Sequence, residues 1–155
     1  MEKHDKPYKH ILVPLDGSEL AELALPDAFA LARLSQAQVT VLQVIVPIAH
    51  HLDPDVDDPD FIEAEGKKYE TLARQYLKDV CERVGCADIT IQAEAKMGSP
   101  AETIIDYAHQ EPIDLIVMAT HGHSGFKRWA FGSVADEVLR GADVPVLLVR
   151  ARSNT

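Results

Sequence analysis

Apolar positions along the chain follow two periods, one typical of strands and one typical of helices. Four short apolar runs, each with β-branched residues, predict buried strands at residues 10–15, 39–46, 113–119 and 144–149. A fifth segment, residues 88–95, alternates Ile89 and Ile91 with polar residues. This alternation predicts a strand nearer the edge of a sheet.

Helical segments are predicted between these strands. The segment that ends at Leu34 is rich in Ala and Leu, and Pro26 is expected to kink it. Ser99 combines with a proline and with Glu102 into a helix-start signal, and another helix is predicted from Ser133 to about Gly141. A further helix, near residues 61–84, has an apolar stripe at Tyr69, Leu72, Ala73, Tyr76, Leu77, Val80 and Val84.

The regular alternation of strands and helices predicts an α/β fold. We expect a Rossmann-like, open five-stranded parallel sheet with helices on both faces. The length fits a single domain over residues 1–155. Within it we expect a polar N-terminal tail at residues 1–8, a long acidic loop at residues 47–60 and a C-terminal tail at residues 151–155.

Composition narrows the possible partners. The formal net charge of −10 disfavours binding to nucleic acid and to anionic membranes. The first residues lack an apolar signal region, and no apolar run is long enough to cross a bilayer, so we expect a cytoplasmic protein. Cys81 and Cys86 match neither a zinc pair nor a CxxC motif, and they are interpreted as reduced packing thiols.

The chemistry is expected beyond the carboxyl ends of the strands, where open α/β sheets bind ligands. Residues 115–135 contain no Asp or Glu, although the chain has 25 of them, and this window holds His121, Gly122, Gly132 and Ser133. Glycines and a helix N-terminus offer backbone N–H groups, which predicts a phosphate cradle. The alternative is a plain capping box formed by Ser133 and Asp136.

Two well-known phosphate motifs are absent. The chain contains neither GxxxxGK[ST] nor GxGxxG, so a P-loop and a dinucleotide-binding fingerprint are both excluded at their defining positions. Any nucleotide must therefore be held by another loop.

Several segments together resemble the universal stress protein family. They are ILVPLDGS from Ile11, MGSP from Met97, DLIVMATHG from Asp114, and FGSVADEVL and PVLLV near the end. The ATP signature of this family is Gly, two residues, Gly, nine residues, then Gly-Ser or Gly-Thr. Gly122 and Gly132-Ser133 match its spacing, whereas Ala119 replaces the first glycine. This replacement matters if the position needs a glycine-only backbone angle or clearance smaller than a methyl group.

The resemblance implies that the protein binds ATP, with Mg²⁺ as a possible companion. The positions expected to flank adenine and ribose are Pro14, Asp16 and Val44. Those expected along the ribose and phosphate approach are Met118, Ala119, His121 and Gly122. Those expected to supply phosphate donors are Gly132, Ser133, Val134 and Ala135. Gly98 is expected to let the backbone come near the nucleotide.

The resemblance also implies a homodimer through the last strand, from Val144 to Val149, because that strand commonly pairs with its two-fold mate in such proteins. A bare apolar edge strand would otherwise favour aggregation. The function implied is an ATP-binding stress-response or regulatory protein, in which the nucleotide modulates dimer or partner contacts. The alternatives are a nucleotide-independent dimeric interaction protein and a slow Mg²⁺-dependent ATPase or phosphotransferase.

Candidate metal and catalytic groups are few. Asp16 could order a metal ion, or cap the first helix with Glu19 as its partner. His50 and His51 lie beside several aspartates, a segment that we interpret as a solvated loop. No Ser/His/Asp triad can be recognised in the sequence, so efficient catalysis is not expected. His121 is interpreted as a phosphate contact.

Overall fold

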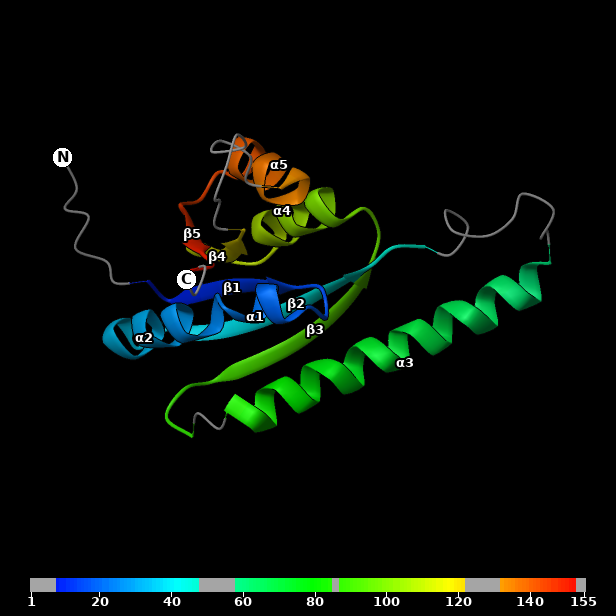
Figure 1. Ribbon diagram of the computed structural model, residues 1–155, viewed down its shortest axis with the longest axis horizontal. Helices are drawn as coiled ribbons and strands as arrows, with labels where there is room; N and C mark the ends of the chain where they lie inside the picture. Colours follow the sequence, from blue (N-terminus) through cyan, green and yellow to red (C-terminus); the bar gives the residue numbers. More distant parts are fainter. Residues whose placement is uncertain (1–7, 48–57, 85–86, 122–131, 153–155) are drawn as a thin grey trace.

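The computed structural model describes residues 8–47, 58–84, 87–121 and 132–152. The strands of its sheet are β1 (His10–Leu15), β2 (Gln38–Ile45), β3 (Ile91–Met97), β4 (Leu115–Thr120) and β5 (Val146–Arg150). The helices are α1 (Glu19–Glu22), α2 (Leu25–Ser35), α3 (Pro59–Val84), α4 (Pro100–Gln110) and α5 (Ser133–Gly141). All strand pairs are parallel, in the order β3-β2-β1-β4-β5 (Figure 1).

Two apolar cores lie on opposite faces of this sheet, because side chains of a strand alternate between its faces. On β1, Val13 belongs to the core under α1, α2 and α3, whereas Leu12 belongs to the core under α4 and α5. The predicted five-stranded parallel sheet with helices on both faces is therefore confirmed.

The first predicted helix is divided in two rather than kinked. α1 ends at Glu22 and α2 begins at Leu25, so that Pro26 lies in the first turn of α2. Proline costs little there, because an N–H group in the first turn has no intrahelical acceptor. α2 ends at Ser35, and its C-cap Gln36 has a φ of 55°, in the left-handed region that often closes a helix.

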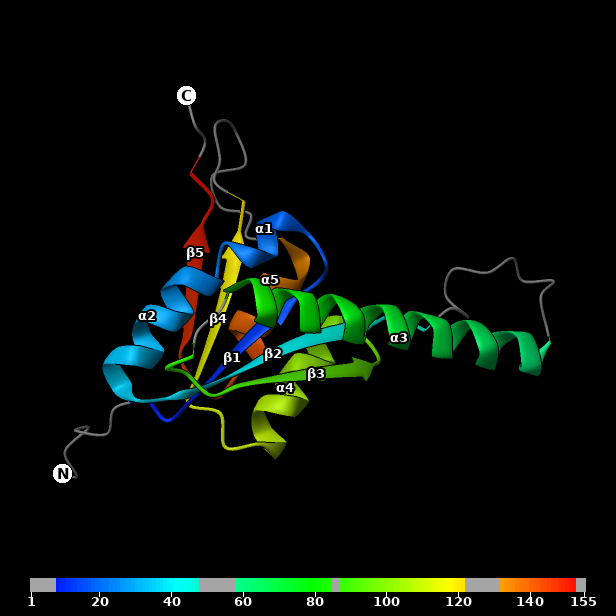
Figure 2. The same ribbon diagram turned by 90° about the horizontal axis from the view of Figure 1, so that it is seen from below.

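α3 is longer than the sheet that it covers. Its buried residues, Ala73, Leu77 and Val80, all lie in its C-terminal half. The N-terminal half extends past the carboxyl ends of the strands, as both ribbon views show (Figures 1 and 2). The predicted stripe was therefore wrong at Tyr69 and Leu72, which are 47% and 57% exposed.

Polar side chains close the amino ends of the strands. Asp114 Oδ2 accepts hydrogen bonds from the backbone N–H groups of Lys9, at 2.7 Å, and His10, at 2.9 Å. Gln38 Nε2 lies 3.1 Å from His10 Nδ1, and His10 Nε2 lies 2.7 Å from Thr40 Oγ1. Burial lowers the pKa of His10, against the weaker opposing effect of nearby carboxylates. These contacts suit a neutral ring that donates from Nε2 to Thr40 Oγ1 and accepts at Nδ1 from the Gln38 amide.

Candidate functional site

A pocket of about 480 Å³ opens at the carboxyl ends of β1, β2 and β4. The strand order reverses at β1, which lies between β2 and β4, and ligands of open α/β sheets bind at such a switch point. We call this cavity the switch-point pocket. Its lining residues are Pro14, Leu15, Asp16, Ser18, Leu20, Ala21, Leu42, Val44, Val46, Pro100, Ile104, Met118, Ala119, Thr120, His121, Gly132, Ser133, Val134 and Ala135.

Most of the residues predicted from the sequence meet in this pocket. Those that line it are Pro14, Asp16, Val44, Met118, Ala119, His121, Gly132, Ser133, Val134 and Ala135. Gly122 and His123 lie outside the described residues, as do His50 and His51. Segments far apart in the sequence thus contribute to one cavity, as the strand ends predicted.

Sequence reasoning missed the contributions of α1 and α4. Leu20 and Ala21 of α1, and Pro100 and Ile104 of α4, also line the pocket. Ile104 is 3% exposed and also belongs to the core under α4 and α5. The sequence did contain a signal for these contributions, because α1 follows β1 and α4 follows β3. A helix that follows a parallel strand begins at the carboxyl end of the sheet.

Part of the pocket lining is apolar, and the start of α5 adds backbone donors to it. Gly132 is the N-cap of α5, with a φ of 85° that glycine adopts readily. The N–H groups of Ser133, Val134 and Ala135 occupy the first turn, where helix geometry supplies no intrahelical acceptor. Such N–H groups and the helix dipole favour an anion.

The alternative capping box at α5 was wrong. Ser133 is the first helical residue rather than the N-cap, and Gly132 has no side chain with which to cap. The α5 N-terminus is joined to the following turn by the backbone bond from Asp136 N to Gly132 O, at 3.0 Å. No hydrogen bond joins the Ser133 hydroxyl to another residue of the described segments, so it can donate to a ligand.

Asp16 supports the loop after β1 but does not cap α1. Its Oδ1 accepts hydrogen bonds from Ser18 N, at 2.9 Å, and from Ser18 Oγ, at 2.5 Å. Ser18 is the N-cap, because its Oγ accepts from Ala21 N at 3.1 Å. The predicted capping role of Asp16 with Glu19 was therefore wrong. Asp16 is nonetheless the one carboxylate among the described residues that line the pocket.

Ala119 fits its position without strain. Among the described residues other than glycine, Gln36 alone has a positive φ, so Ala119 does not require a glycine-only backbone angle. Its methyl group packs against the core under α1, α2 and α3. Replacement of a glycine by alanine at this position therefore places the added methyl group against protein as well as at the pocket wall.

Gly98 does not line the pocket, and its predicted approach to a nucleotide is not supported by the geometry. A Cβ atom at Gly98 would overlap the Thr103 hydroxyl, and the φ of 156° is one that other residues rarely adopt. Its N–H donates to Ile45 O at 2.9 Å. The glycine is explained by the tight passage from β3 into α4.

Metal and membrane features are limited within the described residues. No group of three His, Cys, Asp or Glu side chains there is arranged to hold a metal ion. In the same segments, no helix combines the length and the hydropathy that crossing a bilayer requires.

Comparison with known proteins agrees with this fold. A profile of the universal stress protein family matches residues 7–150. The universal stress protein MJ0531 of Methanocaldococcus jannaschii is 32% identical over 152 residues, covering 92% of this chain and 82% of that protein. This chain belongs to the universal stress protein family.

Solved structures share its architecture. The structure of the hypothetical protein MJ0577 superposes with a TM-score of 0.79 at 28% identity, covering 96% of this chain and 99% of that chain. A universal stress protein from Archaeoglobus fulgidus, solved in complex with dAMP, superposes with a TM-score of 0.57 at 25% identity, covering 92% and 98%.

Proposed function

We propose that this protein binds ATP in the switch-point pocket and acts as a stress-response or regulatory protein. The observation that carries the proposal is the convergence of the first turn of α5 with the carboxyl ends of β1, β2 and β4 on one cavity. The volume of about 480 Å³ lies in the range of pockets that hold small ligands and cofactors. A relative with the same fold was solved with dAMP.

The two sides of the pocket suit the two parts of a nucleotide. The apolar side, with Leu42, Val44 and Met118, suits the flat face of an adenine ring. The N–H groups of Ser133 and Val134, together with the Ser133 hydroxyl, suit phosphate oxygens. We propose that His121, which lines the same pocket, contacts phosphate.

The small number of carboxylates in the described lining also favours an anionic ligand in this pocket. The chain carries a net charge of −10, so an anionic ligand needs a site that is locally poor in carboxylates. We propose that Asp16, which lines the pocket, can hold Mg²⁺ beside the phosphates. Its Oδ1 already accepts from Ser18, and a carboxylate has lone pairs for further partners.

We further propose that the protein forms a homodimer through β5 and that ATP modulates dimer or partner contacts. β5 is an edge strand, paired with β4 on one side, and Leu147 is 38% exposed. An uncovered edge of this kind favours pairing with a second strand. ATP can shift such contacts only if the two arrangements bind it with different affinity. The cytoplasmic location expected from the sequence stays a prediction.

The test compares two substitutions at Ser133, using calorimetric titration with ATP. Ser133→Ala removes the hydroxyl and keeps the backbone N–H, whereas Ser133→Pro removes both. Proline is tolerated at the first helical position, and the ψ of 149° at Gly132 suits a residue before proline. We expect Ser133→Pro to weaken ATP binding by about tenfold, the equivalent of one charge-assisted hydrogen bond, and Ser133→Ala to weaken it less.

Two results would overturn the ATP assignment. One is the absence of adenine nucleotide from the denatured purified protein, seen by mass spectrometry, together with no saturable ATP binding. The other is unchanged ATP affinity in Ser133→Pro with an intact circular dichroism spectrum. The dimer is tested separately by light scattering with and without ATP, and a monomer under both conditions contradicts it.

A further inference from the structure

We infer that a second pocket, between β2 and α3, binds a small organic cation that carries an ammonium group on an apolar body. We call this cavity, of about 560 Å³, the α3 pocket. Its lining residues are Gly17, Gln43, Val44, Ile45, Val46, Glu65, Tyr69, Leu72, Ala73 and Tyr76. It shares Val44 and Val46 with the switch-point pocket but otherwise has its own walls.

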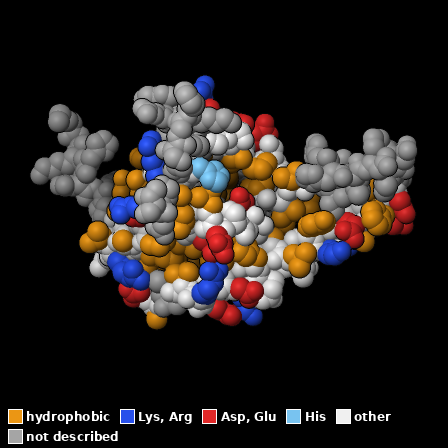
Figure 3. Space-filling model, viewed as in Figure 1, with side chains coloured by type: hydrophobic (Ala, Val, Ile, Leu, Met, Phe, Trp, Pro, Cys, Tyr) orange, Lys and Arg blue, Asp and Glu red, His pale blue; other side chains and the backbone are white. Residues whose placement is uncertain are grey.

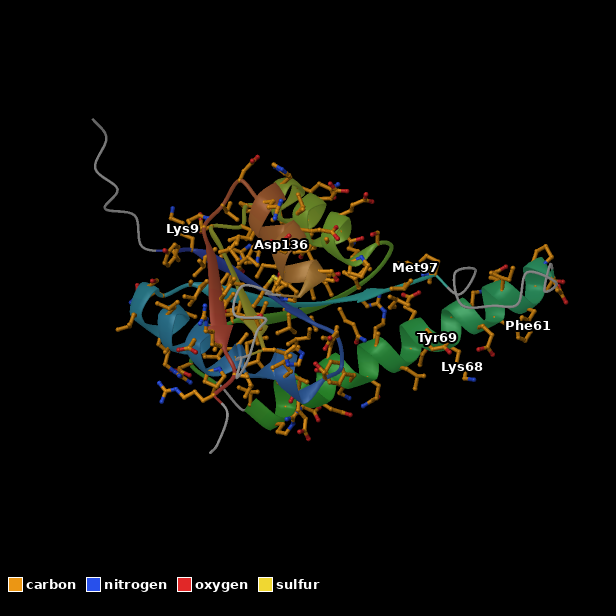
Figure 4. The ribbon with its side chains drawn as sticks, turned by 45° about the horizontal axis from the view of Figure 1, so that its top comes forward. Lys9, Phe61, Lys68, Tyr69, Met97 and Asp136 are labelled. Carbon is orange, nitrogen blue, oxygen red and sulfur yellow. The ribbon has the colours of Figure 1, made fainter. Side chains whose placement is uncertain are left out.

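The α3 pocket exists because α3 continues beyond the sheet. Toward its C-terminus, Leu77 and Val80 of the helix are fully buried in the core that α3 shares with the sheet. Toward its N-terminus the strands end, and the Met97 methyl group of β3 lies 3.6 Å from where a Cβ atom on Gly66 would be. Figure 4 shows Tyr69 near this point, about midway along α3. Hydrophobic side chains gather where the helix leaves the body of the molecule (Figure 3).

Gln43 gives this apolar cavity a specific acceptor. Its neighbours on the same face of β2, Val41 and Ile45, are buried in the core, where an amide is out of place. The Gln43 Oε1 atom is buried and has no hydrogen-bond partner among the described residues. A buried carbonyl oxygen without a partner is costly, and a ligand N–H group would satisfy it.

The charged group of the pocket is negative. Glu65 lies on the wall, with its side chain 28% exposed, and no Lys or Arg is among the described lining residues. Lys68 Nζ lies 3.7 Å from Glu65 Oε1, which is longer than a hydrogen bond, and the lysine side chain is 65% exposed. Figure 4 shows Lys68 pointing away from the sheet, whereas Glu65 lines the cavity.

Two carboxylates near Tyr76 also contribute negative charge around the cavity. Its hydroxyl donates to Glu22 Oε1 at 3.0 Å, which leaves the oxygen free to act as an acceptor inside the pocket. Burial raises the pKa of Tyr76 most, and the carboxylates of Glu22 and Asp16 raise it further. The carboxylates favour a cation over an anion in the cavity, whereas burial disfavours either charge, and Arg83, paired with Glu22 at 2.9 Å, offsets part of the negative charge.

The remaining wall suits an apolar ligand body. Leu72, Ala73, Ile45 and Val46 provide aliphatic surface, and the rings of Tyr69 and Tyr76 can also attract a cation. Tyr69 and Leu72 are about half exposed, so the cavity can be reached from solvent. The buried acceptor, the carboxylate and the two aromatic rings together suit an amine that has an aromatic or aliphatic stem.

The experiment titrates the full chain with three probes that share one body and differ in charge: 2-phenylethylammonium, 2-phenylethanol and 3-phenylpropionate. Binding is followed by calorimetry and by amide chemical shifts in NMR spectra. We expect 2-phenylethylammonium to bind about tenfold more tightly than the alcohol, and the carboxylate to show no binding. The shifts are expected at β2 and at the middle of α3.

Matched variants locate the site. Glu65→Gln removes the charge and keeps the shape, and we expect it to weaken 2-phenylethylammonium binding by about tenfold. Glu63→Gln is the control, because Glu63 lies on the same helix, outside the pocket, paired with Lys67 at 2.7 Å. Gln43→Met removes the acceptor at similar length, and we expect weaker ammonium binding with thermal stability kept or raised.

Three outcomes overturn the inference. They are the absence of saturable 2-phenylethylammonium binding, equal affinity for the ammonium and the alcohol, and an equal loss in Glu65→Gln and Glu63→Gln. Because ATP binding is measured by separate variants at Ser133, a failure here leaves the proposal for the switch-point pocket standing, and the reverse also holds.

Discussion

At the amino ends of the strands, polar side chains bond to one another, whereas at the carboxyl ends several of them face cavities. The imidazole of His10 lies between Gln38 and Thr40, and Thr40 in turn hydrogen-bonds Tyr107. At the opposite end of β2, the Gln43 oxygen is buried and has no partner in the described part of the chain, and β2 borders two pockets.

This difference separates residues that hold the fold from residues that are available to ligands. A polar group whose partners are supplied by the protein contributes to stability, and its loss should be measured as unfolding free energy. A polar group that faces a cavity contributes to binding, and its loss should be measured as affinity. The following predictions test whether the two ends of the sheet divide in this way.

The largest effect is expected at the amino end, from Asp114→Ala. This change removes the acceptor of two backbone N–H groups, those of Lys9 and His10, and leaves the partly buried one unsatisfied. We expect a loss of about 2 kcal/mol in the free energy of unfolding, measured with urea, and unchanged ATP affinity. The control is Asp88→Ala, because Asp88 is 61% exposed and pairs only with the exposed Arg33 among described residues. A similar loss in both variants would contradict the prediction.

The next effect is expected at Gly98, which belongs to the carboxyl end but serves the fold. Gly98→Ala should cost about 1–2 kcal/mol of stability, because the new Cβ atom overlaps the Thr103 hydroxyl. Adding Thr103→Ala removes that overlap and should restore part of the loss. ATP affinity should change little in either variant. A large loss of ATP affinity in the double variant would instead support the original expectation for Gly98.

A smaller effect is expected at Asp16, measured as affinity. Asp16→Asn keeps an oxygen that can accept from Ser18 and removes the charge. Without Mg²⁺, ATP should bind about two- to fivefold more tightly, because an exposed repulsion is removed. With Mg²⁺, the gain in affinity that the metal brings should shrink. Asp27→Asn, on the exposed side of α2, is the control and should change neither value.

The smallest effect is the pH dependence contributed by His10. Its folded-state pKa is lowered by burial, so the unfolded chain takes up a proton at higher pH than the folded protein does. Stability contributed by the neutral ring is therefore present above a pH of about 6.5 and is lost as the pH falls below that value. His10→Gln should be less stable at neutral pH but should lose less on acidification. Urea unfolding at several pH values gives both slopes, and parallel slopes would refute the prediction.

The fold could be predicted well from the sequence because its main signals are local. Apolar runs with β-branched residues identified the strands, and Ser99-Pro100 marked the start of α4 although Ser99 makes no side-chain cap bond. The switch-point pocket followed from the strand ends, because parallel strands bring their carboxyl ends to one edge. Because successive side chains of a strand point to opposite faces of the sheet, Leu12 and Val13 belong to different cores, which follows from the strand prediction alone.

The α3 pocket could not be predicted in the same way. Periodicity identified Tyr69, Leu72 and Tyr76 as one helix face, but it does not say how far the sheet extends beneath that face. Gln43 gave a usable signal, since it is a polar residue inside an apolar strand that faces the same core as Val41. The role of Gly98 could not be predicted for another reason. Its close neighbour, the Thr103 side chain, is known only once the positions of β3 and α4 are known.

The unequal support along α3 has a consequence for local unfolding. Its last three turns are held by the buried residues Leu77 and Val80, whereas none of the described residues of α3 before Tyr69 is buried. A helix segment of that length is marginal in water by itself. Amide hydrogens in the projecting part should therefore exchange with solvent faster than those near Leu77. A protease should also cleave first in that part, and a ligand that bridges the helix and β2 would slow both processes.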